Sequence, residues 1–161
     1  MDLLNDVLLK LDEPQSMYAM YGAYAENRQP LAFISPESRR MLGNRMSRMS
    51  VNVARLTCSS MVERLRVSGF SDDRAWKLFV DNDLDQLLPQ ALFDAVLFGE
   101  SFVLCWAKDG KATASVESPL SCAVIRDPSD RSVTAGIKKF DKDKKTHVYV
   151  YLPDRVEYYV A

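Results

Sequence analysis

The first hundred residues carry apolar side chains at helical spacing. Leucines and valines recur every three or four positions from Leu3 to Leu11, which predicts a helix. Pro14 suits the first turn of a second helix, which we expect to reach about Asn27. That helix is rich in tyrosine and methionine, which fits either packing against a neighbouring element or contact with another subunit.

Four further helices are expected before residue 100. Ser35–Pro36 resembles a cap followed by a first-turn proline, and Gly43–Asn44 can end that short helix. A second start near Ser47 leads to a helix ending at about Met61. Residues 62–67 then alternate imperfectly, which favours a short strand.

Two helices follow that predicted strand. Ser71 is expected to cap the helix that contains Trp76. Asp83 is expected to cap the next one, with Gln86 in a capping-box relation. This last helix is apolar over most of its circumference, so we expect it to be central to the fold, and Gly99 should end it.

After residue 100 the pattern changes to that of strands. Residues 102–106 are continuously apolar, as in a strand covered on both faces. Asp109–Gly110 predicts a tight hairpin, and residues 141–145 predict a charged hairpin tip. Residues 147–152 alternate cleanly. The expected fold class is therefore α+β, with a helical N-terminal half packed on an antiparallel meander of about six strands.

No convincing linker or repeat divides the chain. The 161 residues are 47% hydrophobic and 27% charged, as in ordinary globular proteins. We expect one domain, 1–161, with a helical part at about 1–100 and a strand-rich part at about 101–161. Because the sequence stops within or just after a strand, we expect it to be a fragment of a longer subunit.

The net charge limits the classes of partner. A formal charge of −1 gives no overall basic field for wrapping nucleic acid. No apolar run approaches the roughly 18 residues that a membrane helix needs, so we expect no membrane partner. The N-terminus lacks the basic and apolar pattern of a secretory signal, so we expect the protein in the cytoplasm of the cell that makes it.

No group of residues specifies a catalytic, cofactor or metal site. Cys58, Cys105 and Cys122 are scattered, and His147 is the only histidine. Acidic residues at 81, 83 and 85 begin like a calcium loop, but glycine and glutamate are missing from the positions that such a loop requires. No glycine-rich phosphate loop is present. We therefore expect no enzyme, no cofactor and no metal.

One segment between residues 39 and 55 is densely basic. A solvated face or salt bridges between subunits would explain it, and contact with nucleic-acid phosphate is a further alternative. The candidate interface or phosphate contacts are Arg39, Arg40, Arg45, Arg48 and Arg55.

An ordered set of segments resembles the portal proteins of tailed bacteriophages, in particular those of actinobacterial phages and prophages. The resemblance covers roughly residues 30–161. Its main segments are Cys58–Phe70, Ala75–Trp76, Asn82–Asp85, Asp94–Leu104, Glu117–Pro119 and Tyr151–Glu157.

The resemblance implies a structural subunit of a ring, usually of about twelve copies, at one vertex of the capsid. In that family the ring docks the terminase and head-completion proteins and passes double-stranded DNA without sequence-specific contact. It implies a place in the virion, with the host cytoplasm as the location before assembly. This chain would supply an outer, wing-like part of the subunit.

The sequence is also compatible with three other functions. A stand-alone interaction or adaptor domain would have the same composition and fold class. A small-molecule enzyme would need converging polar groups in a pocket. A nucleic-acid-binding module would use the arginine segment.

Overall fold

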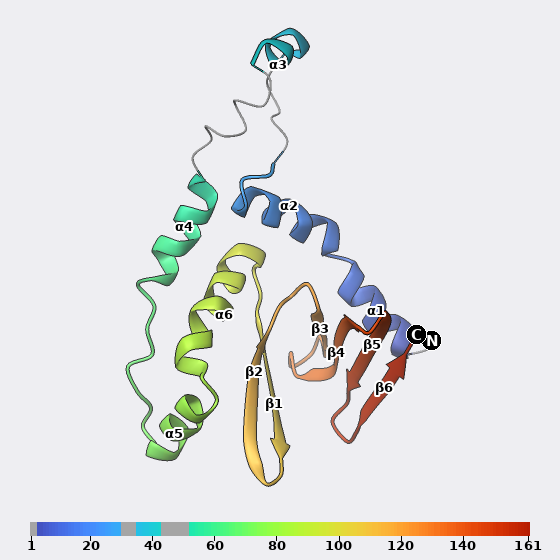
Figure 1. Ribbon diagram of the computed structural model, residues 1–161. Helices are drawn as coiled ribbons and strands as arrows, with labels where there is room; N and C mark the ends of the chain where they lie inside the picture. Colours follow the sequence, from blue (N-terminus) through green and yellow to red (C-terminus); the bar gives the residue numbers. More distant parts are fainter. Residues whose placement is uncertain (1–2, 30–34, 43–51) are drawn as a thin grey trace.

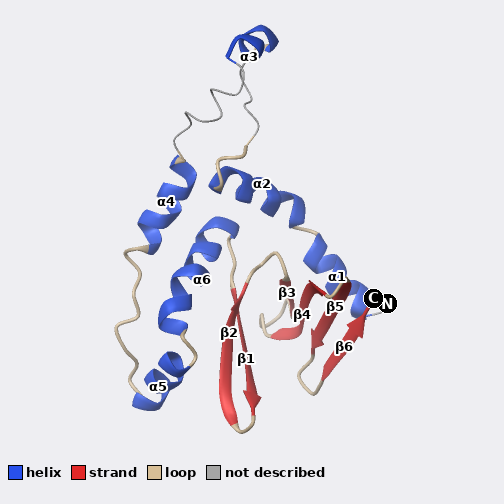
Figure 2. Cartoon of the chain, in the orientation of Figure 1, coloured by secondary structure: helices blue, strands red, loops and turns tan. Residues whose placement is uncertain are grey.

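The computed structural model describes residues 3–29, 35–42 and 52–161, in which helices precede strands (Figures 1 and 2). The helices are α1 (Leu3–Asp12), α2 (Gln15–Ala25), α3 (Pro36–Leu42), α4 (Val53–Val62), α5 (Asp73–Asp81) and α6 (Leu84–Phe98). The strands are β1 (Phe102–Lys108), β2 (Lys111–Glu117), β3 (Cys122–Arg126), β4 (Val133–Lys142), β5 (Lys145–Tyr151) and β6 (Val156–Val160). The predicted α+β class is confirmed.

The strands form two antiparallel sheets, whereas the sequence predicted one meander. β1 and β2 form a separate hairpin, and the other strands form a sheet in the order β3-β4-β5-β6. The division occurs at a turn after β2, where the backbone N–H groups of Ser121 and Cys122 both donate to the carbonyl of Ser118. Pro119 in this turn is fully buried. The turn directs β3 away from β2, so the two strands do not pair.

The main core lies between α1 and the four-stranded sheet. Val7 and Leu11 are one helical turn apart, so they face the sheet together. The buried residues on the sheet side are Ala123, Ala135, Ile137, Val148 and Val150. We call α1 with β3–β6 the sheet unit.

The tight turns of both hairpins match their sequences. Asp109 and Gly110 have φ of 51° and 74°, and Asp143 and Lys144 have φ of 53° and 60°. Two consecutive positive φ values are typical of the two-residue turns that suit the twist of a hairpin. The predicted turn and the predicted charged hairpin tip are both confirmed.

Three local predictions are wrong. Residues 62–67 form no strand, because α4 continues to Val62 and the chain then runs as a loop. Asp72, rather than Ser71, caps α5 by accepting from the N–H of Arg74 at 2.8 Å. Asp83 makes no side-chain cap to α6 and adopts a left-handed φ of 54°.

Helix α6 runs continuously through Pro89 and contacts α2, α4, α5 and β2, so its predicted central position is confirmed. Gly99 ends it with φ of 87°, as expected. The predicted starts and ends at Gly43–Asn44 and Ser47 lie outside the described residues. We call α4–α6 with the β1–β2 hairpin the helical unit.

Candidate subunit interface

The chain exposes more surface than a compact monomer of its mass. Its accessible surface is 12060 Å². A compact monomer of 18.3 kDa would expose about 8,000 Å². The fold is therefore extended rather than compact.

Many large apolar side chains of the helical unit face solvent. Strand β1 was expected to be covered on both faces, but Val103 and Trp106 are 49% and 41% exposed. That prediction is wrong for the isolated chain. The exposed apolar residues between α4 and α6 are Val53, Leu56, Met61, Leu65, Val67, Phe70, Trp76, Leu78, Val80 and Leu87.

An aromatic cluster forms the densest part of this surface. Phe79 is buried, and its ring centroid lies 5.4 Å from that of Phe70 and 5.7 Å from that of Trp76. Phe70 and Trp76 themselves remain exposed. Next to them, Leu65, Val67 and other residues line a hollow of about 340 Å³. Half-exposed aromatic side chains beside a hollow are typical anchors of protein–protein contacts.

A larger groove runs between α2, α4 and α6, with a volume of about 1050 Å³. Asp94 lies buried in its wall and accepts a hydrogen bond from Gln90 Nε2 at 2.9 Å. Burial raises the pKa of the Asp94 carboxyl. The guanidinium of Arg55 lies 5.5 Å from the centroid of the Phe93 ring. The groove is therefore amphipathic, with acidic and basic side chains close to apolar walls.

Polar side chains link the helices that form this groove. Tyr18 Oη donates to Glu100 Oε1 at 2.5 Å, and the Tyr18 ring packs edge-on against Phe98 at 5.1 Å. Burial and this contact raise the pKa of Tyr18. Asn52 caps α4 through the N–H of Arg55 and donates to the carbonyl of Ala25 in α2. These bonds tie α2 to both α4 and the end of α6.

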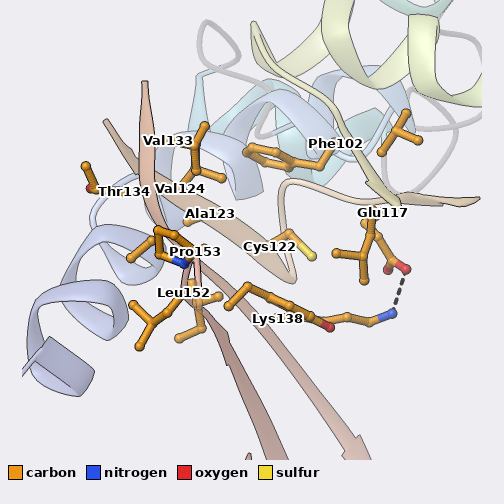
Figure 3. Close-up of a pocket in the computed structure, with 16 residues that line it drawn as sticks. Phe102, Glu117, Cys122, Ala123, Val124, Val133, Thr134, Lys138, Leu152 and Pro153 are labelled. Atoms are coloured by element: carbon orange, nitrogen blue, oxygen red, sulfur yellow. Dashed lines mark hydrogen bonds and ion pairs between the residues drawn. The ribbon is translucent and has the colours of Figure 1, made fainter. Parts of the chain in front are cut away.

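A smaller apolar cavity of about 300 Å³ lies where the hairpin meets the four-stranded sheet (Figure 3). Phe102 and Val133 approach it from the two sheets. At its rim, Lys138 Nζ donates to Glu117 Oε1 at 2.6 Å, in an ion pair that is mostly shielded from solvent. Burial raises the pKa of the Cys122 thiol to about 11, so this cysteine stays protonated and is a poor nucleophile.

The structure separates the arginines of the basic segment. Arg39 and Arg40 belong to α3, which stands apart from the other elements (Figure 1), and Arg55 lies on α4. Arg45 and Arg48 lie outside the described residues. Arg40 and Arg55 are both exposed. Their role as interface or phosphate contacts stays a prediction.

Within residues 3–29, 35–42 and 52–161, no group of three or more potential ligands is placed to hold a metal ion. His147 stacks on Phe140 at 5.3 Å and on Tyr158 at 5.8 Å, and its Nδ1 lies 2.5 Å from Tyr158 Oη. None of the described helices could span a membrane.

Sequence reasoning missed two features of these surfaces. The groove depends on the arrangement of α2, α4 and α6, which no local pattern encodes. Asn82 was treated only as part of an acidic run, yet its side chain joins α5 to β2. It accepts from Ala114 N at 2.9 Å and donates to the carbonyls of Leu78 and Ala112.

The described residues therefore form a non-compact α+β fold with exposed apolar faces. Residues 38–161, about three quarters of the chain, match the family described as phage portal protein, SPP1 Gp6-like. The chain belongs to this family of phage structural proteins. No curated protein matches it.

Proposed function

We propose that this chain is a structural subunit of a portal ring at the capsid vertex of a phage or prophage, through which DNA is packaged and ejected. Membership of the portal family carries this proposal. The exposed apolar surface of the helical unit supports it, because a ring subunit must bury such surface against its neighbours.

In this role the subunit performs no catalysis. It positions neighbouring copies of the chain in the ring. DNA then passes through the ring, and the packaging proteins dock on it. The partners that we propose are other copies of the chain, the terminase and head-completion proteins, and double-stranded DNA that is not read by sequence. The near-neutral net charge suits a conduit, because a strongly basic surface would retain phosphate.

The arginines of residues 39–55 are proposed as interface or phosphate contacts at the periphery. Arg40 and Arg55 can be tested directly, since both are exposed. Replacing both by glutamine should weaken ring formation or lower any affinity for DNA at low salt. No change in either property would remove this part of the proposal.

An adaptor domain without catalysis is the second candidate. The groove of about 1050 Å³ favours it, because an adaptor needs a preformed surface for a peptide or helix. Light scattering after gel filtration, with electron microscopy of the same fraction, separates the two. The portal proposal predicts closed rings, at about 220 kDa for about twelve copies of an 18.3 kDa chain. A stable monomer at every concentration would contradict it and favour the adaptor.

A further inference from the structure

The outer edge of β6 is open in the described part of the chain. Thr146 and Ala161 exchange both backbone hydrogen bonds, each at 3.0 Å. In an antiparallel pair such bonded pairs recur every second residue. The β5–β6 register then directs the backbone groups of Val156, Tyr158 and Val160 away from β5. These three side chains are also exposed on one face.

The outer edge of β1 is open in the same way. Lys108 pairs with Lys111 across the two-residue turn, so the bonded positions on β1 are the even-numbered ones. The backbone groups of Val103, Cys105 and Ala107 therefore point away from β2. No backbone or side-chain bond from any described residue reaches them.

The outer edge of β2, in contrast, is occupied by a side chain. Asn82 accepts from the N–H of Ala114 at 2.9 Å and donates to the carbonyl of Ala112 at 3.3 Å. One asparagine side chain thus bonds to β2 as a neighbouring strand would. The chain protects the β2 edge and leaves those of β1 and β6 free.

The two free edges carry few of the features that normally prevent strand addition. Residues 102–107 contain no charge, proline or glycine, and residues 156–160 contain one acid, Glu157. Apolar, unprotected edges of this kind pair with other strands unless something covers them. Their lengths are compatible, since β1 has 7 residues and β6 has 5.

We propose that the β1 edge of one copy pairs with the β6 edge of the next copy, so that main-chain hydrogen bonds join successive subunits. This inference rests on the proposed ring. Because the two edges are different surfaces, the contact is head-to-tail, and repeating it closes a ring when the rotation permits. The exposed Val103 would then lie on the same face of the joined sheet as Val156 and Tyr158, and would form a cross-strand pair with one of them.

Proline substitution tests this edge pairing selectively. Tyr158→Pro and Cys105→Pro each remove an N–H that points away from the chain's own sheet, so each variant should retain its fold. Each should shift the assembled protein to the 18.3 kDa monomer, with an unchanged circular dichroism spectrum. The matched controls Tyr158→Val and Cys105→Val keep the N–H and should still assemble.

A cross-linking experiment covers the case in which a proline variant does not fold. The native Cys105 is exposed. In a Cys58→Ser background, cysteine placed singly at Val156, Tyr158 or Val160 should give a ladder of disulfide-linked multimers from at least one position. Leu9→Cys, exposed on α1 of the sheet unit, is the control that should give none.

The outcomes separate this inference from the ring proposal. Folded proline variants that still form rings, or the absence of a ladder from all three cysteine positions, would overturn edge pairing and leave the ring proposal intact. Wild-type protein that stays monomeric at all concentrations would overturn the ring proposal, and edge pairing with it.

Discussion

The sheet unit and the helical unit contain similar apolar residues and bury them to different extents. In the sheet unit, Leu11 and Ile137 are each 2% exposed. In the helical unit, Leu56 is 61% exposed and Trp76 is 39% exposed. The sheet unit therefore completes its core within one chain. The helical unit has apolar surface that the described residues of this chain leave exposed.

If the proposed ring forms, this difference separates the residues that stabilise the monomer from those that join copies. Mutations of residues that are buried or bonded within one chain should change the stability of the monomer, and mutations of the exposed apolar residues of the helical unit should change association. Four predictions follow this division, from the largest expected effect to the smallest.

Truncating Leu11 should have the largest effect. Leu11→Ala removes a buried side chain between α1 and the sheet, and should lower the free energy of unfolding by about 2–5 kcal/mol. The matched variant Leu9→Ala lies on the same helix with its side chain 69% exposed, and should change it by less than about 0.5 kcal/mol. Urea denaturation of both variants measures the free energy of unfolding. Equal losses would contradict the account.

Truncating Trp76 should act on association rather than on folding. Trp76→Ala removes a half-exposed anchor, so the dissociation constant between copies should rise about 30-fold, equivalent to about 2 kcal/mol. Sedimentation or light scattering across a dilution series measures it. Lys77→Ala, on the same helix, is the control and should leave association unchanged. A Trp76→Ala variant that assembles normally would show that the aromatic cluster is not part of the interface.

Removing the Asn82 side chain should weaken the link between α5 and the hairpin. Asn82→Ala leaves the N–H of Ala114 and the carbonyl of Ala112 without their partner, which should cost about 1–2 kcal/mol of stability. It also frees the β2 edge, so the variant should aggregate more readily. Asn82→Asp keeps the acceptor and loses the donor, so its loss should be smaller. If Asn82→Asp proved less stable than Asn82→Ala, this role of the Asn82 side chain would be contradicted.

Asp94 should make stability depend on pH. Burial raises its pKa in the folded state, so the folded protein holds this proton to higher pH than the unfolded chain. Its contribution to stability is complete below the unfolded pKa of about 3.9 and is lost as pH rises through the raised folded pKa. Relative to wild type, Asp94→Asn should therefore gain stability between acid and neutral pH. Urea denaturation at several pH values measures the difference in the free energy of unfolding between Asp94→Asn and wild type. A difference that stays constant with pH would contradict this prediction.

The sequence predicted the elements whose cause is local. The spacing from Leu3 to Leu11 identified α1, and Asp109–Gly110 identified the first hairpin because these residues favour the required positive φ. Gly99 identified the end of α6 for the same reason.

The wrong predictions have two physical causes. First, Val62 and Leu65 are three residues apart, a spacing that suits a helix end as well as an imperfect strand, and α4 continues to Val62. Second, Asp83 has the sequence context of a helix cap, but long-range bonds from the neighbouring Asn82 to β2 fix this corner.

The candidate interface was the least predictable part. A run such as Phe102–Trp106 is equally apolar whether its own chain or a neighbour covers it. Sequence alone assigned it to a core, and the structure shows it half uncovered. The arginine segment stayed a prediction, since Arg45 and Arg48 lie outside the described residues.

Hydrogen–deuterium exchange of dilute and assembled protein would test the central claim most directly, because it reports backbone protection in each segment. The account predicts that assembly adds protection at residues 65–80, 103–107 and 156–160. It predicts no change at Ile137 and Val150, which one chain already buries. Protection gained in the sheet core alone, or in no segment, would contradict the claim that the open surfaces of the helical unit and β6 are completed by other copies.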